Sequence, residues 1–250
     1  MIEDLKNKNI IIFGATSGIG SDLSFLLNKL GVNLILVAKN KVNLSSLSKK
    51  IKKKVKVFQC DFNNHKKIQE VFKKISNLKY EIAGLVYVAG THLIKPIATT
   101  DKRDLDDLLS INFIAPYLII KEFSSKILKT DMSSIVLVSS ISAFSGQSAL
   151  TAYSSTKGAI VSLTKSAAIE MSRNKIRVNC VAPGHIEGTK MSNQVKDLLT
   201  NEQYDKLLKS HPLGTGKPVD VAYCIAYLLS NKSKWMTGSI IKIDGGFSVG

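Results

Sequence analysis

A short apolar run that leads into a glycine-rich loop constrains the fold more than any other part of this chain. Residues 9–13 read Asn-Ile-Ile-Ile-Phe, Gly14, Gly18 and Gly20 follow, and a helix-like pattern continues to Leu30. Glycines allow the backbone to approach a ligand closely, and the free amides at the start of a helix favour an anion. An ordinary tight turn with close helix packing is the structural alternative. We interpret the segment as a strand, a phosphate-binding loop and a helix.

The rest of the chain continues this alternation of strand and helix. Further strand candidates lie at 32–37, 55–59, 84–88, 135–138, 175–181 and 239–243, and helical patterns lie at 65–76, 101–129 (two segments, with Pro116 inside the second), 151–171 and 218–230. Residues 190–209 are amphipathic, as expected of a lid over a substrate. Such alternation predicts a parallel sheet with right-handed crossovers. We predict an α/β fold, a Rossmann-type doubly wound seven-stranded parallel sheet with helices on both faces, as a single domain over residues 1–250.

The composition excludes several classes of protein. A chain of 250 residues that is 44% hydrophobic can bury a sizeable core. No apolar run approaches the ~20 residues that span a bilayer, and the first residues lack the pattern of a signal peptide. Cys60, Cys180 and Cys224 are scattered without metal-ligand or disulfide spacing. We expect no membrane association, no metal and a cytoplasmic location.

The formal net charge of +16 raises the question of nucleic-acid binding. Among the 35 basic residues only Arg103, Arg173 and Arg177 are arginines, and aromatic residues make up 7% of the chain. Sequence-specific DNA readers use the arginine fork, and single-strand binders use aromatic platforms. We therefore predict a lysine-rich solvated surface with no specific nucleic-acid site, and leave weak attraction to polyanions open.

Tyr153 and Lys157 form the first candidate for chemistry. They are four residues apart in a helical pattern, so they lie one turn apart on the same face. A phenol has an ordinary pKa of roughly 10, and a neighbouring ammonium lowers it, which suits acid/base work on a carbonyl or an alcohol. Tyr117 and Lys121 have the same spacing, so the motif alone is weak. Ser140 adds context because it follows a predicted strand and is expected at the edge of the sheet where ligands bind.

The ends of the second and third strands bear on the cofactor. A Rossmann unit that binds NAD has an acidic residue about 20 residues beyond the glycine loop, whereas this chain has Lys39 between Ala38 and Asn40. This favours a 2′-phosphate, and NADP(H) over NAD(H), unless Lys39 is merely a surface lysine. Asp61 ends the third strand and either accepts from an adenine amino group or caps the helix that follows.

Three further polar side chains belong to none of these motifs. Asn112 lies among apolar neighbours, and a buried amide needs partners, so we expect it to bind a helix carbonyl or an ordered water. His65 and His92 have no evident partner in the sequence. We expect both histidines to be surface or loop residues rather than ligands.

Together these motifs resemble the short-chain dehydrogenase/reductase family over the whole chain. The resemblance rests on Gly14, Gly18, Gly20, Asp61, Ala89, Gly90, Asn112, Ser140, Tyr153, Lys157, Asn179, Pro183, Gly184 and the closing Asp244, Gly245 and Gly246. It implies that Tyr153 is the general acid/base and that Lys157 lowers its pKa and holds the nicotinamide ribose. It also implies that Ser140 binds the substrate oxygen and that Asn112 keeps a water that relays protons.

The resemblance further implies which residues bind the cofactor. They are Gly14, Thr16, Ser17, Gly18, Ile19, Gly20, Lys39, Asp61, Phe62, Ala89, Gly90, Tyr153, Lys157, Pro183, Gly184, Ile186 and Thr189. Four positions depart from the family pattern. Phe13 stands where Thr is frequent before the first glycine, and Tyr87 stands where Asn is frequent. Ser17 stands where many NADP-dependent members are basic, and Thr189 comes one residue later than the usual Thr.

Within the family the chain is most similar to 3-oxoacyl-(acyl carrier protein) reductases. The implied function is NADP(H)-dependent interconversion of a carbonyl and a secondary alcohol by hydride transfer. The substrate is a small molecule, with a 3-oxoacyl thioester on acyl carrier protein as one candidate. A sugar or small hydroxy compound is the alternative substrate, and a non-catalytic dinucleotide-binding sensor or scaffold is the alternative function. The resemblance also implies a homo-oligomer, a tetramer or a dimer.

Overall fold

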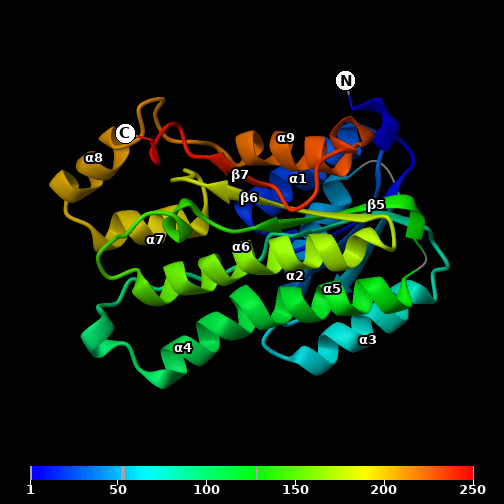
Figure 1. Ribbon diagram of the computed structural model, residues 1–250, viewed down its shortest axis with the longest axis horizontal. Helices are drawn as coiled ribbons and strands as arrows, with labels where there is room; N and C mark the ends of the chain where they lie inside the picture. The colour runs from blue at the N-terminus through cyan, green and yellow to red at the C-terminus, as the bar shows by residue number, and fades with distance from the viewer. Residues whose placement is uncertain (1, 52–53, 128, 250) are drawn as a thin grey trace.

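The computed structural model describes residues 2–51, 54–127 and 129–249, and its centre is one parallel sheet (Figure 1). The strands are β1 (Asn9–Phe13), β2 (Asn33–Ala38), β3 (Val55–Gln59), β4 (Ile82–Tyr87), β5 (Lys129–Val138), β6 (Ile176–Pro183) and β7 (Ile240–Ile243). Within the described residues they form a seven-stranded sheet in the order β3-β2-β1-β4-β5-β6-β7. The predicted fold class is confirmed. The chain order reverses between β1 and β4, and ligands bind at such a switch point, outside the carboxyl ends of the strands.

Helices cover both faces of the sheet (Figure 1). One face packs against α1 (Gly18–Lys29), α2 (Lys41–Lys50) and α9 (Pro218–Leu229), and the other against α3 (His65–Ser76), α5 (Ala115–Lys126) and α6 (Thr151–Ser172). The central strand β1 therefore reads as a nearly continuous apolar run, because its side chains are buried alternately in the two cores. This double burial positions the carboxyl ends of the strands, where the site lies.

The segment between β4 and β5 differs from the prediction. Its helices α4 (Lys102–Leu109) and α5 are joined without a break by η3 (Ser110–Ile114), a π-helical stretch. Pro116 lies inside this continuous helical run, just after the π-helical stretch, and it has no N–H to donate back to the preceding turn. The strand β5 starts at Lys129, earlier than the apolar run at 135–138 indicates, because its first part is polar.

The predicted lid at 190–209 is two helices, α7 (Lys190–Leu198) and α8 (Asn201–Lys209). Thr189 and Thr200 each accept a hydrogen bond from the backbone of the first turn, so each helix begins with its own cap. Figure 1 shows both helices at one end of the molecule, beside the C-terminal segment. The remaining short helical turns are η1 (Glu3–Leu5), η2 (Ile97–Thr99), η4 (Ile141–Ala143) and η5 (Asn231–Ser233).

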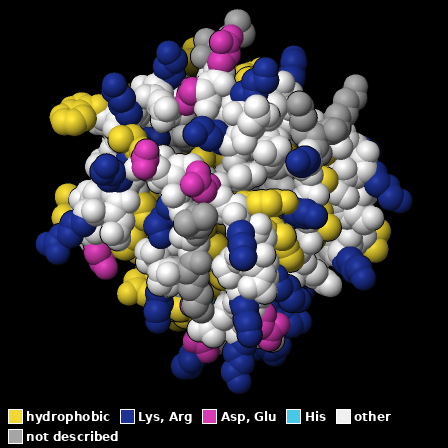
Figure 2. Space-filling model, turned by 90° about the vertical axis from the view of Figure 1, so that its right-hand side faces the viewer, with side chains coloured by type: hydrophobic (Ala, Val, Ile, Leu, Met, Phe, Trp, Pro, Cys, Tyr) yellow, Lys and Arg dark blue, Asp and Glu magenta, His cyan; other side chains and the backbone are white. Residues whose placement is uncertain are grey.

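Basic side chains are dispersed over the face shown in Figure 2, interleaved with acidic and apolar ones. Within residues 2–51, 54–127 and 129–249, no helix combines the length and the apolar character needed to cross a bilayer.

Candidate active site

A cavity of about 880 Å³ opens at the carboxyl ends of the strands. Its walls come from the loop after β1, from the ends of β2 to β6, from the start of α6 and from the lid. Every predicted site residue lines it except Gly20 and Asn112. These two lie just behind the wall, Gly20 against Gly14 and Asn112 beside Gly90. The structure thus brings together residues that are spread over most of the chain.

In the glycine loop, residues 14–20, the positions of Gly14 and Gly20 leave no room for a side chain. Gly14 has φ +89°, and a Cβ built on it would lie 2.5 Å from the Ala89 nitrogen. A Cβ on Gly20 would lie 2.3 Å from the Gly14 oxygen. Ser17 caps α1 by accepting a hydrogen bond from the Gly20 amide, 3.0 Å away. Because the loop stays this close to the strands, Gly18 and Ile19 line the cavity with the first turn of α1, which suits the pyrophosphate of a dinucleotide.

Lys39 and Asp61 form an ion pair at the ends of β2 and β3. The Lys39 Nζ lies 2.9 Å from Asp61 Oδ2, and the Lys39 side chain is 69% exposed. Partial burial raises the pKa of Asp61, but the Lys39 hydrogen bond and the Asn63 amide outweigh it, so the pKa lies below its usual range. Asp61 does not cap α3, because the N-cap residue is Asn64. Its other oxygen closes a local turn by accepting from Asn63, at 3.2 Å.

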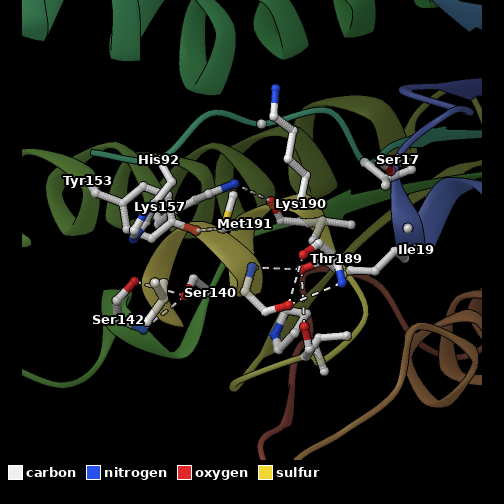
Figure 3. A pocket seen from close by; sticks show the side chains of 18 of the residues that line it. Ser17, Ile19, His92, Ser140, Ser142, Tyr153, Lys157, Thr189, Lys190 and Met191 are labelled. Carbon is white, nitrogen blue, oxygen red and sulfur yellow. Dashed lines mark hydrogen bonds between the residues drawn. The ribbon is translucent and has the colours of Figure 1, made fainter. Parts of the chain in front are cut away.

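Ser140, Tyr153 and Lys157 meet on the wall formed by β5 and α6 (Figure 3). Ser140 lies two residues beyond the end of β5, and Tyr153 lies in the first turn of α6. Lys157, one turn later, is buried, and its Nζ donates to the Val138 oxygen at 3.1 Å. The same ammonium lies 5.8 Å from the centre of the Tyr153 ring. The predicted grouping of a serine, a tyrosine and a lysine at this edge is therefore present in the fold.

The prediction that Lys157 lowers the pKa of Tyr153 is wrong for this structure. Burial raises the pKa of Tyr153 to about 12, and a hydrogen bond with Ser140 acts in the opposite direction. Burial also lowers the pKa of Lys157 to about 8. Removal from water disfavours the charged form of each group, and it is the largest influence on both pKa values.

Asn112 lies in the π-helical stretch η3 and is buried. Its amide nitrogen donates to the Thr91 oxygen at 2.9 Å and to Thr156 Oγ1 at 3.0 Å, and its oxygen accepts from the Thr91 amide at 2.9 Å. Its partners are therefore a loop backbone and a side chain, rather than the expected helix carbonyl. A Cβ on Gly90 would lie 3.5 Å from Asn112 Oδ1 and 3.3 Å from Lys157 Nζ, so both polar atoms face the same small space.

Two of the departures from the family pattern have a structural role here. The buried Tyr87 hydroxyl donates to the Ile111 oxygen at 2.6 Å and so ties β4 to η3. The Thr189 hydroxyl donates to the Ile186 oxygen at 3.1 Å and accepts from the Ser192 amide at 3.0 Å. The methyl group of Thr189 lies against Gly18. Thr189 thus lines the cavity, but its hydroxyl serves the start of α7.

His92 lies in the loop after β4, as predicted, and it also has a partner that the sequence does not reveal. Its ring lies edge-on to the Tyr153 ring, with the ring centres 4.9 Å apart, and it lines the cavity. Burial, with a smaller effect of Lys157, lowers the pKa of His92. His92 follows Ala89 and Gly90, just beyond the carboxyl end of a parallel strand. This position in the sequence could have indicated that it lies near the site. His65 also has a partner, because its Nε2 lies 3.2 Å from Ser110 Oγ.

Two further histidines, which the sequence reasoning missed, join the lid to the end of β6. Buried His211 accepts from the His185 amide at Nε2, 3.2 Å away, so its Nδ1 carries the proton and donates to the Leu207 oxygen at 3.0 Å. His185 Nε2 lies 3.4 Å from the Tyr204 hydroxyl of α8. These contacts connect segments that no local sequence pattern relates.

The described residues contain no group of three or more His, Cys, Asp or Glu side chains that could hold a metal ion.

A family model described as Enoyl-(Acyl carrier protein) reductase matches residues 14–248. The chain belongs to the short-chain dehydrogenase/reductase family. It is an oxidoreductase, and the suggested role as a non-catalytic sensor or scaffold is not needed to explain its site.

The chain is similar to curated proteins along nearly its whole length. It is 32% identical to the 3-oxoacyl-[acyl-carrier-protein] reductase FabG of Rickettsia prowazekii, over 97% of this chain and 98% of that one. It is also 32% identical to the same-named protein of Thermotoga maritima, over 98% and 99%. Among solved structures, a short-chain dehydrogenase/reductase from Brucella melitensis, titled glucose/ribitol dehydrogenase, superposes with a TM-score of 0.91 at 29% identity over 100% of both chains.

Proposed function

We propose that this protein is an NADP(H)-dependent reductase that interconverts a carbonyl and a secondary alcohol, with Tyr153 as the general acid/base. The observation that carries the proposal is that Ser140, Tyr153 and Lys157 share one cavity with the glycine loop. The dinucleotide, when bound, supplies or accepts the hydride. The fit of its pyrophosphate is supported by the glycine loop, where a Cβ would strike backbone atoms at Gly14 and Gly20.

Tyr153 has the properties of a proton donor to a carbonyl oxygen. Its raised pKa keeps the phenol protonated at neutral pH, so the hydroxyl is available to donate in the direction of reduction. Ser140 donates a second hydrogen bond to the same oxygen as negative charge develops there. Lys157 holds a ribose hydroxyl of the cofactor. Asn112 Oδ1 faces the same space as Lys157 Nζ and completes a route by which protons reach Tyr153.

The preference for NADP(H) rests on the end of β2. No acidic side chain follows Ala38, and the exposed ammonium of Lys39 lines the cavity. A 2′-phosphate would compete with Asp61 for that ammonium, and a doubly charged phosphate is the stronger partner. We expect Lys39→Ala to reduce the preference for NADPH over NADH about tenfold, measured as the ratio of kcat/KM values, with Lys41→Ala as the matched control. An unchanged ratio would mean that Lys39 does not bind the 2′-phosphate and is an ordinary surface lysine.

The substrate we favour is a 3-oxoacyl thioester, presented on an acyl carrier protein. The names of the Rickettsia and Thermotoga relatives support this choice. The wall that the lid and the C-terminal segment add is largely apolar, as an acyl chain requires, with Met191, Val195, Leu199, Leu207 and Phe247. The Brucella neighbour, titled glucose/ribitol dehydrogenase, keeps a sugar as the second candidate.

The decisive experiment follows NADPH oxidation with acetoacetyl-CoA as the thioester probe, with NADH and a panel of sugars in parallel. We expect turnover with the thioester and a loss of at least about a thousandfold in kcat for Tyr153→Phe, which keeps the ring but removes the proton. NADPH binding by fluorescence should survive the change. Tyr117→Phe changes the other tyrosine that has a lysine four residues later, and this variant should behave as wild type. Turnover retained in Tyr153→Phe would refute the assignment.

We also propose a homo-oligomer, a dimer or a tetramer. Ile169 is 74% exposed on α6 and Trp235 is 98% exposed near the C-terminus, and both are apolar side chains that a second copy would cover. Sedimentation at micromolar concentration should show more than the monomer mass, and a single monomeric species would contradict this.

A further inference from the structure

Ser142 makes two contacts with the proposed substrate-binding serine. Its backbone amide donates to Ser140 Oγ at 3.2 Å, and its own hydroxyl donates to the same oxygen at 2.8 Å. Ser142 is 5% exposed and lines the cavity. Figure 3 shows it beside Ser140 on the side of the cavity that carries Tyr153. The contact is thus a buried one, inside the site.

The hydrogen-bonding capacity of Ser140 follows from this geometry. A serine hydroxyl has one proton to donate and two lone pairs that accept. In Ser140 both accepting positions are taken by the amide and the hydroxyl of Ser142. The remaining capacity is the O–H, so Ser140 can only donate toward the cavity. A hydroxyl that already accepts hydrogen bonds is also a stronger donor, because chains of hydrogen bonds polarise one another.

We propose that Ser142 is a positioning residue that forces Ser140 to act as the hydrogen-bond donor to the substrate oxygen. The inference rests on the proposed function of Ser140 and Tyr153. Without the Ser142 hydroxyl, one lone pair of Ser140 is free to accept from the Tyr153 hydroxyl, and the tyrosine proton is then directed at Ser140 rather than at the substrate.

The neighbouring serines bond to other groups, so the contact with Ser140 is specific to Ser142 and is not shared by the serines of this loop. The Ser139 hydroxyl donates to the Lys157 carbonyl at 2.7 Å and ties β5 to α6. The Ser145 hydroxyl donates to the Ile141 carbonyl at 3.3 Å, and Ser145 does not line the cavity. Among these side chains, only that of Ser142 donates to Ser140 in the described structure.

Ser142→Ala tests the proposal, because the alanine keeps the backbone amide that holds the turn. With NADPH and acetoacetyl-CoA we expect kcat to fall about five- to tenfold, as for one lost hydrogen bond, with KM and NADPH affinity within about twofold. Ser142→Thr, which restores the hydroxyl, should recover most of kcat. Ser145→Ala, the matched control from the same loop, should equal wild type.

The pH profile gives a readout that a purely structural role would not move. Ser140 lowers the pKa of Tyr153, so a weaker donor in Ser142→Ala should displace the rising pH profile of alcohol oxidation, which needs the phenolate, to higher pH. His92 and Lys157, the other titratable groups facing Tyr153, are unchanged in every variant. Wild-type kcat and pH profile in Ser142→Ala would overturn the inference while leaving the proposed function intact. If Tyr153→Phe also kept its turnover, the proposed function itself would fail.

Discussion

Where the glycine loop lines the cavity the wall is largely backbone, whereas the lid, α7 and α8, contributes side chains. The glycine loop packs against Ala89, just beyond β4, and α1 behind it buries Leu23 and Leu27 and packs on α9. In the lid, α8 buries no residue and α7 buries only Ser192 among those described. The two ends of one cavity therefore have different physical origins.

This difference separates what the fold determines from what individual side chains determine. A wall made of backbone can change only if the strands move, so its ligand must suit the fold. A wall made of half-exposed helices can change side chain by side chain at little cost in stability. We therefore expect recognition of a dinucleotide to follow from the family fold, and recognition of the substrate to depend on residues particular to this chain.

The largest expected effect is in hydrogen exchange. Opening α8 exposes no buried side chain, whereas opening β1 exposes both cores. Amides of β1 should therefore exchange at least about a thousandfold more slowly than those of α8. Mass spectrometry of exchanged peptides measures this directly. Equal protection of the two segments would contradict the proposed difference in stability between β1 and the lid.

The second effect concerns packing at the glycine loop. Gly20→Ala places a Cβ 2.3 Å from the Gly14 oxygen, so we expect a loss of about 1–3 kcal/mol in the free energy of unfolding, together with weaker NADPH binding. Gly158→Ala is the matched control: it lies within α6 and its Cβ would meet no atom within 4 Å. It should stabilise the protein by about 0.5–1 kcal/mol. Urea denaturation gives both values, and a neutral Gly20→Ala would mean that the loop can relax.

A third effect comes from the buried lysine of the catalytic wall. Burial lowers the pKa of Lys157 from 10.5 to about 8, so between these values the unfolded chain holds a proton that the folded chain has released. Stability therefore rises with pH across this interval, by about 1.4 kcal/mol per unit from this group, and the gain is lost as pH falls through 8.

Lys157→Met should remove this contribution. Raised cysteine pKa values act in the opposite direction above pH 9, where Cys180 and Cys224 start to ionise in the unfolded chain. The measurement is therefore the difference between wild type and variant in urea denaturation from pH 8 to 9.5. A constant difference would show that Lys157 is solvated.

The smallest effect is expected in the lid. The Tyr204 hydroxyl is 3.4 Å from His185 Nε2, a long contact, so Tyr204→Phe should change the free energy of unfolding by less than about 0.5 kcal/mol. We expect KM for acetoacetyl-CoA to rise a few-fold, because the contact helps to hold α8 over the cavity. Tyr223→Phe, which is 57% exposed on α9, is the control and should change neither quantity. A large loss of stability in Tyr204→Phe would show that the lid is part of the folding core.

The sheet, the glycine loop and the grouping of Ser140, Tyr153 and Lys157 at one edge could all be predicted from the amino-acid sequence. These follow from short-range regularities: apolar runs of strand length, glycines before a helix, and a four-residue spacing on a helical face. Each of these patterns is local, so it can be recognised before the packing of distant elements is known.

The electrostatics and the long-range contacts could not be predicted in this way. The ion pair of Lys39 with Asp61, the place of His92 beside Tyr153, and the link of His211 to the end of β6 each join residues far apart in the chain. The direction of the Tyr153 pKa shift depends on burial, which no spacing encodes. The physical reason is that desolvation and side-chain pairing depend on what packs around a group, and that is settled only when distant elements meet.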